Sequence, residues 1–220
     1  MKRWMNLLAL AALVASGTAS AQEATDPVAQ RVGTIVEDFT KAVNGCGVRL
    51  PPVRIAVDQS PILIAMQQDG VLHVATWKAV EPDIKAMFGP WAQSGTLGLT
   101  PEQQFGEVFN RLLVPHEMGH WVQMSDGRDT GADFWDGEVS ANRTAIAFWS
   151  LTPQGAARIE TEIDNYNRFL EALPNPVPPG QDPKEYFQAN YEKLFQDAEA
   201  YGWYQGLFMR EAWAMRGSAT

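Results

Sequence analysis

The segment VPHEMGHW, residues 114–121, carries two of the three histidines in a chain of 220 residues. His116 and His120 are four residues apart, close to one helical turn, so both imidazoles project from the same face of a helix. Two nitrogen donors on one face are what a tetrahedral zinc site takes from a helix. Glu117 lies about 100° around the helix from His116, where it can accept a proton from a zinc-bound water. Gly119 leaves room for another element to approach this helix closely.

This His-Glu-x-x-His pattern resembles the zinc-binding motif of the zincin metallopeptidases, over the motif and its flanks, residues 101–150. The resemblance implies Zn²⁺ held by His116 and His120, with Glu117 as the catalytic base for hydrolysis of peptide bonds. Zincins also tend to place an edge strand above the motif helix, where the substrate binds in extended form. Residues 71–76 are the candidate for that strand.

The third metal ligand depends on the branch of zincins. Residues 121–128 contain no histidine, which excludes the metzincin pattern. The gluzincin branch takes a glutamate from a second helix, and Glu138, 18 residues after His120, is therefore the predicted ligand. Asn142 lies one turn beyond it, where many gluzincins have an aspartate. Its carbonyl can still accept a hydrogen bond from a ligand imidazole.

Other residues are alternatives to Glu138. Asp133 and Asp136 precede it in an expected loop, but they lack the glycine-threonine context of the aspartate-ligand branch. His73 is the third histidine and falls in an expected strand, where a structural partner is more usual. Glu138 itself has a simpler interpretation, as an acid that the helix dipole stabilises in a first turn.

The transition state of such a reaction needs a hydrogen-bond donor near the developing oxyanion. Zincins often supply a tyrosine, histidine or arginine from the C-terminal part of the chain, so Tyr201 is the predicted catalytic donor and Tyr204 the second choice. Packing in an aromatic core is the alternative for both. Trp121, Trp135 and Trp149 either line an apolar cleft or belong to the core.

The first 21 residues, 1–21, have the pattern of a signal peptide. Lys2 and Arg3 precede a short apolar run, residues 7–15, and the small residues 19–21 offer a cleavage site. The apolar run is too short to span a bilayer. We therefore expect an exported protein, periplasmic or secreted, without stable membrane insertion after cleavage. An N-terminal membrane anchor is the alternative.

Loss of Lys2 and Arg3 with this segment takes the formal net charge from −9 to −11. Nucleic acids and anionic membranes bind basic patches, so neither is an expected partner. A peptide or protein substrate is expected, and the acidity indicates either solubility or a preference for basic substrates. Cys46 is the one cysteine, so the chain forms no internal disulfide.

Hydrophobic periodicity predicts the elements around the motif. Pro115 must kink the preceding helix or begin a new one, and residues 78–100 give no clear pattern. We expect strands at 53–57, 62–66 and 71–76 with a turn at 69–70, and helices at 27–45, from 101, from near 136, at 153–173 and at 183–215, the last interrupted near Gly202.

The fold class that follows is α+β, zincin-like and mostly helical, with a small N-terminal antiparallel or mixed sheet. A signal peptide, residues 1–21, precedes one metallopeptidase domain, residues 22–220. The expected function is that of an exported zinc-dependent metallopeptidase that uses a zinc-bound water, with Glu117 as general base. The alternative is an exported binding or accessory protein that keeps the zincin scaffold without proteolysis.

Overall fold

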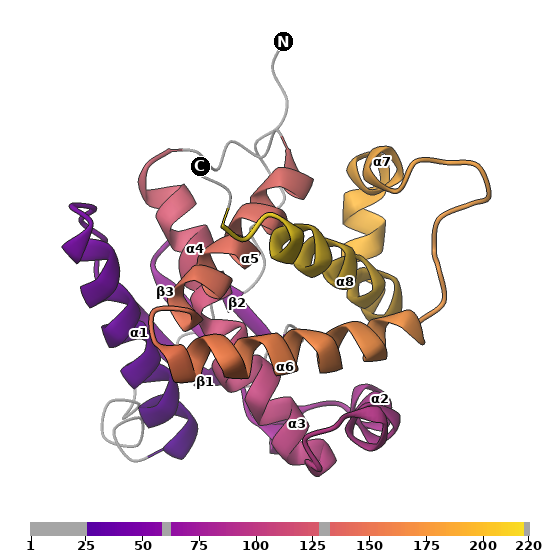
Figure 1. The fold of residues 1–220 in the computed structure, drawn as a ribbon, viewed down its shortest axis with the longest axis horizontal. Coiled ribbons are helices and arrows are strands. Elements are labelled where there is room, and N and C mark those ends of the chain that lie inside the picture. Colours follow the sequence, from indigo (N-terminus) through magenta and orange to yellow (C-terminus); the bar gives the residue numbers. More distant parts are fainter. Residues whose placement is uncertain (1–25, 59–62, 128–132, 218–220) are drawn as a thin grey trace, which may run out of the picture.

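The computed structural model describes residues 26–58, 63–127 and 133–217, so the expected signal peptide lies outside the described residues. The described chain is mostly helical with one small mixed sheet, which confirms the α+β expectation. In Figure 1, α1 lies at one side of the molecule, and α7 with its long connection from α6 lies at the other. The elements are α1 (Pro27–Gly45), β1 (Arg54–Asp58), β2 (Ile64–Met66), β3 (Val71–Ala75), α2 (Pro82–Ser94), α3 (Pro101–Glu107), α4 (Val114–Ser125), α5 (Phe134–Trp149), α6 (Pro153–Glu171), α7 (Pro183–Phe195) and α8 (Ala198–Ala214).

The sheet has the order β1-β3-β2, in which β3 pairs parallel with β1 and antiparallel with β2. Gly70, at φ 78°, makes the tight turn between β2 and β3. The prediction that residues 71–76 form the substrate edge strand is wrong, because β3 lies in the middle of the sheet. Its side chains Leu72 and Val74 are fully buried. The edge strand next to the motif helix is β2, only three residues long, and periodicity alone does not give the order of such short strands.

The chain that leads into the motif helix changes its helical pitch. After α3 the backbone forms a π-helical segment, Val108–Leu112, and α4 begins as a new helix at Val114. Pro115 explains the break, because it lacks an N–H group and its ring crowds the carbonyl four residues earlier. The indole N–H of Trp149 donates to the carbonyl of Leu112 at 3.2 Å. This bond satisfies a backbone acceptor at the break and ties it to the end of α5.

The motif helix α4 packs closely against α5 through Gly119. A Cβ at position 119 would lie 3.0 Å from the Cα of Ala141 and 3.2 Å from its carbonyl oxygen. Ala141 is fully buried. The two backbones therefore touch where any larger residue would hold them apart, which confirms the expected role of Gly119.

The C-terminal helices differ from the expectation in one respect. The interruption falls between α7 and α8 at residues 196–197, and Gly202 lies inside α8. Asp197 causes the restart, because its carboxylate accepts hydrogen bonds from the N–H groups of Glu199 and Ala200 at 3.1 and 3.0 Å. Gly202 instead lets α8 lie close to Leu173.

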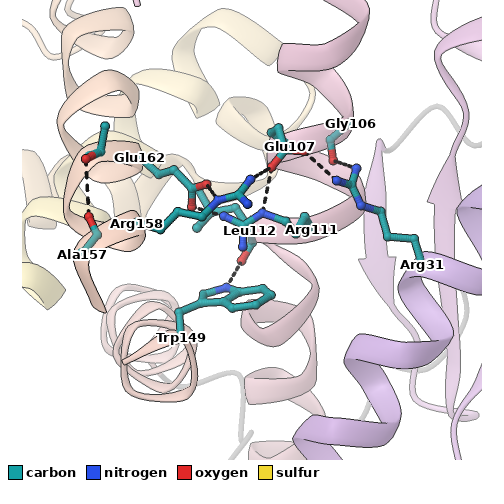
Figure 2. A network of polar contacts seen from close by, with 10 residues as sticks. Arg31, Gly106, Glu107, Arg111, Leu112, Trp149, Ala157, Arg158 and Glu162 are labelled. Atoms are coloured by element: carbon teal, nitrogen blue, oxygen red, sulfur yellow. Dashed lines mark hydrogen bonds and ion pairs between the residues drawn. The ribbon is translucent and has the colours of Figure 1, made fainter. Parts of the chain in front are cut away.

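A network of charged side chains joins α1, α3, the π-helical segment and α6 (Figure 2). Glu107 accepts from Arg31 at 2.6 Å and from Arg111 at 2.8 Å, and it also pairs with Arg158. Glu162 accepts from Arg158 at 2.7 Å and pairs with Arg111. Burial raises the pKa of Glu107, but the hydrogen bond from Arg31 and the three guanidinium charges outweigh it and lower the pKa below 4.5. The network therefore fixes α6 against α3 and the π-helical segment, which precede the motif.

No helix among the described residues is long and apolar enough to cross a membrane.

The Gly119 contact predicts a stability loss in Gly119→Ala. The added methyl group meets backbone atoms that cannot move aside, so we expect unfolding free energy to fall by about 1–3 kcal/mol. Urea denaturation of the metal-free protein, followed by tryptophan fluorescence, measures it. Gly33→Ala in α1 is the matched control, because its Cβ meets only the Ile55 Cδ1 atom at 3.7 Å. It should gain up to about 1 kcal/mol. A Gly119→Ala protein as stable as the wild type would contradict the close packing.

The charged network predicts a pH-dependent effect of Glu107→Gln. At pH 7 the variant loses a carboxylate that three arginines share, and we expect a loss of about 2 kcal/mol. Because the pKa of Glu107 is lowered on folding, its stabilisation is complete above the unfolded pKa, 4.5, and is lost as the pH falls through the folded pKa. The unfolding free energies of the wild type and Glu107→Gln, measured by denaturation between pH 7 and pH 3, should therefore approach each other as the pH falls. The exposed Glu160→Gln on α6 should change little at any pH, and a constant gap for Glu107→Gln would refute the network's role.

Candidate functional site

Three potential metal ligands converge where α4 crosses α5. His116 and His120 come from α4, and Glu138 comes from the first turns of α5. The two imidazole Nε2 atoms are 3.1 Å apart, and the carboxylate of Glu138 lies 3.4 Å from His116 Nε2 and 3.9 Å from His120 Nε2. All three donor atoms lie within 4.8 Å of one another. The structure thus brings together the three residues that the sequence predicts as ligands.

A hydrogen bond from the next turn of α5 orients His116. The Asn142 amide nitrogen donates to the carbonyl of Glu138 at 3.1 Å, which turns its carbonyl oxygen toward His116 Nδ1 at 3.1 Å. In the neutral imidazole Nδ1 therefore carries the proton, and the Nε2 lone pair faces the cluster. Asn142 is fully buried, as a fixed support requires.

Gln123 orients His120 in the same way. Its amide nitrogen donates to the carbonyl of Gly137 at 3.0 Å, and its carbonyl oxygen faces His120 Nδ1 at 3.2 Å. Gln123 was not predicted from the sequence. The signal was present, because position 123 lies three residues after His120 on the same face of α4.

The donor set fits a tetrahedral zinc ion. Bonds of 2.0–2.1 Å to two imidazoles in tetrahedral geometry separate the nitrogens by about 3.3 Å, close to the 3.1 Å between the His116 and His120 Nε2 atoms. Two lone pairs and a carboxylate facing one point repel unless a cation or a proton lies among them. Burial lowers the pKa of His116, but the hydrogen bond and charge of Glu138 outweigh it and raise the pKa above 6.5. Protons therefore compete with a metal ion for this site at low pH.

Helix α8 holds the third candidate ligand, Glu138, through two hydrogen bonds. The Tyr201 hydroxyl donates to Glu138 Oε1 at 2.9 Å, and the Gln205 amide donates to Oε2 at 3.1 Å. Burial raises the pKa of Glu138, but the hydrogen bond to His116 and the nearby imidazole charges outweigh it and bring the pKa to about 2. Glu138 is therefore a carboxylate at neutral pH. Each oxygen accepts one bond from α8 and keeps a second lone pair for a metal.

The two predicted tyrosines occupy different places. Tyr201 lines the site, and burial followed by the charge of Glu138 raises its pKa well above 10, so it remains a hydroxyl donor. Its role as the oxyanion donor stays a prediction, since its hydroxyl here bonds to Glu138. Tyr204 is fully buried and donates to the carbonyl of Pro183 at 3.2 Å, away from the cluster. The second choice is therefore wrong, because the three-residue step turns Tyr204 about 60° around α8 from Tyr201, toward the core.

Glu117 lies beside the cluster without belonging to it. Its Oε2 atom accepts a hydrogen bond from the backbone N–H of Met66 in the edge strand β2 at 2.8 Å. Burial raises the pKa of Glu117 above 4.5, although the two imidazoles and the Met66 bond oppose this. A carboxylate with a raised pKa, held in place by one oxygen, is suited to accept a proton with the other.

The alternative ligands have other partners. Asp133 caps α5, where its carboxylate accepts from the N–H of Asp136 at 3.0 Å, and Asp136 pairs with Lys184 at 2.6 Å. His73 lies on β3 and is not part of the three-residue cluster.

The cluster opens into a cavity of about 780 Å³ whose described lining comes from β2 and from α2, α4, α5, α6, α7 and α8. The three tryptophans near the motif do not belong to this lining, so the core interpretation holds for Trp121, Trp135 and Trp149 among the described residues. Gln205 does line the cavity, and it was not predicted from the sequence. Its position four residues after Tyr201, on the same face of α8, was the available signal.

No protein-family model, no curated protein and no solved structure matches the chain.

The hydrogen bond to His116 predicts weaker metal binding in Asn142→Leu. Leucine has nearly the same shape but accepts no hydrogen bond, so His116 loses the partner that fixes its tautomer. We expect zinc affinity to fall about 10–100-fold, measured by competition with a chelating dye. Asn110→Leu is the matched control, because Asn110 is also buried but donates to Ala75 on β3, away from the cluster. It should bind zinc like the wild type. Equal affinities in all three proteins would exclude Asn142 from the site.

Proposed function

We propose that this protein is a zinc-dependent metallopeptidase that hydrolyses peptide bonds. One observation carries the proposal: His116, His120 and Glu138 converge on a single point, with the carboxylate of Glu117 beside them. Two oriented imidazoles and one carboxylate form the ligand set of catalytic zinc sites that keep an open position for water or substrate.

Zinc bound there would act as a Lewis acid, polarising a carbonyl group and lowering the pKa of water to about 7. Glu117 is the group that takes the proton from the attacking water and passes it to the leaving amine. The bond from Met66 N–H holds one Glu117 oxygen, which leaves the other free for this transfer. Tyr201 positions Glu138, and in the proposed reaction its hydroxyl also donates toward the developing oxyanion.

The proposed fold relationship is to the zincins, of the gluzincin type. Its support is local: a His-Glu-x-x-His helix, a glutamate ligand from the next helix, and an edge strand lying over the motif. The strand in that place is β2. Export to the periplasm or the medium is also a proposal, and it rests on residues 1–21.

The variant Glu117→Gln tests the peptidase proposal. Glutamine keeps the shape of the side chain but cannot act as a base. We expect purified wild type and variant to retain zinc equally, while cleavage of a diverse peptide pool falls about 10²–10⁴-fold in the variant. Metal analysis and mass spectrometry of the pool give the two measurements.

His120→Ala serves as the control for metal dependence and should lose both zinc and cleavage. If the wild type retains zinc but cleaves the pool no better than Glu117→Gln, the peptidase proposal fails. A binding or accessory protein on the same scaffold would then be the better reading.

A further inference from the structure

The cavity continues past the cluster into a space between α2 and α6. We call this space the apolar compartment, and the side chains that define it are all hydrophobic: Ile84, Met87, Phe88, Trp91, Phe109 and Phe169. Its aromatic wall is firmly built, because the rings of Trp91 and Phe169 stack at 4.1 Å with an interplanar angle of 10°. Phe88 and Trp91 stack at 5.5 Å behind them.

Part of this hydrophobic surface remains uncovered. Phe88 and Trp91 are each 3% exposed and belong to the core, whereas Ile84, Met87 and Phe169 are only half-buried. These three side chains line the cavity, and the surface of that lining is mostly apolar. Apolar surface left open inside a pocket gains free energy when an apolar ligand covers it.

The six side chains that define the compartment carry no charge. Lys85 is the cation nearest in sequence on α2, and its ammonium group bonds to the carbonyl of Lys78 and lies over the ring of Trp77. No lysine or arginine is among the described residues that line the cavity. A charged side chain that entered the compartment would lose its hydration without gaining a partner there.

The compartment is continuous with the catalytic groups. Leu113, one helical turn before His116 and Glu117, lines the same cavity, and so does Tyr166 from α6. The ring of Tyr166 contacts that of Trp91 at 5.6 Å in a tilted arrangement, and burial together with the charge of Glu138 raises the pKa of Tyr166. A substrate held at Glu117 can therefore place a neighbouring side chain between α2 and α6.

We propose that the apolar compartment is the specificity subsite, and that it selects peptides with a large apolar side chain, such as phenylalanine or leucine, next to the scissile bond. This inference rests on the proposed peptidase function. A buried aromatic side chain gains enough over alanine to favour such peptides about 10–100-fold in kcat/KM.

A series of quenched fluorescent peptides tests the inference. One position carries phenylalanine, leucine, alanine, lysine or glutamate in a constant background of glycine and serine. The wild type should cleave the phenylalanine and leucine peptides about 10–100-fold faster than the alanine peptide, and the glutamate peptide slowest.

The variant Met87→Glu places a carboxylate in the compartment. We expect cleavage of the phenylalanine peptide to fall at least about 10-fold and that of the lysine peptide to rise relative to it. Ala86→Glu is the matched control, since Ala86 is the exposed neighbour on α2 and does not line the cavity. It should cleave like the wild type. Met87→Ala, which adds no charge, covers the case in which Met87→Glu does not fold, and it should weaken the phenylalanine preference.

Binding to Glu117→Gln separates the two proposals, because this variant should hold peptides uncleaved. Tighter binding of the phenylalanine peptide than of the alanine peptide, reduced by Met87→Glu, supports the subsite even if the wild type does not cleave, and the peptidase proposal then fails alone. Cleavage without any preference, or a preference that Met87→Glu leaves intact, overturns the subsite alone. Neither cleavage nor preferential binding overturns both.

Discussion

The close crossing of α4 and α5 at Gly119 and Ala141 is the contact on which the site depends. His116 and His120 project from α4, whereas Glu138 and Asn142 project from α5. The distance between the two helix axes therefore sets both the separation of the imidazoles from the carboxylate and the length of the Asn142 bond. With the backbones in contact, the carboxylate reaches 3.4 Å from His116 Nε2. A side chain at position 119 would separate the helices and lengthen both contacts together.

The supports of the two imidazoles are neutral, and this has a chemical consequence. Asn142 and Gln123 each accept a hydrogen bond through an amide oxygen, so neither imidazole gains the added basicity that a carboxylate partner supplies. Glu138 is the one anion of the ligand set, and its pKa of about 2 keeps it charged. A divalent cation held there would keep a net positive charge. Such a site binds its metal less tightly than a carboxylate-supported one, and it polarises a carbonyl more strongly.

Local spacing was sufficient only for pairs of site residues that lie on one helix. The four-residue spacing of His116 and His120, and that of Glu138 and Asn142, fix the relative directions of these side chains whatever the rest of the chain does. Spacing places Gln205 on the same face of α8 as Tyr201, but its contact with Glu138 could not be predicted in this way, because it joins positions 67 residues apart. The prediction of the edge strand is wrong for a related reason. A three-residue β2 carries too little pattern to show that it, and not β3, is the edge.

The helix boundaries show the same division between local and tertiary signals. The predicted helix starts at residues 27 and 101 are correct, and Asp26 and Thr100 cap them through contacts within a few residues. The helix interruption predicted near Gly202 is wrong because a glycine can serve either a bend or a close packing contact. Only the position of Leu173 decides between them. Helix α2 was not evident because it continues through Pro90, against the usual preference of proline.

Helix α6 takes part in both the charged network and the lining of the cavity. One part of it carries Arg158 and Glu162, which fasten it to the segment before the motif, and its later part carries Tyr166 and Phe169, which line the cavity. The three candidate metal ligands, by contrast, all come from α4 and α5. Side chains between α2 and α6 can therefore change without moving a ligand, provided that the network keeps α6 in place. Such substitutions can change what the cavity binds while His116, His120 and Glu138 keep their positions.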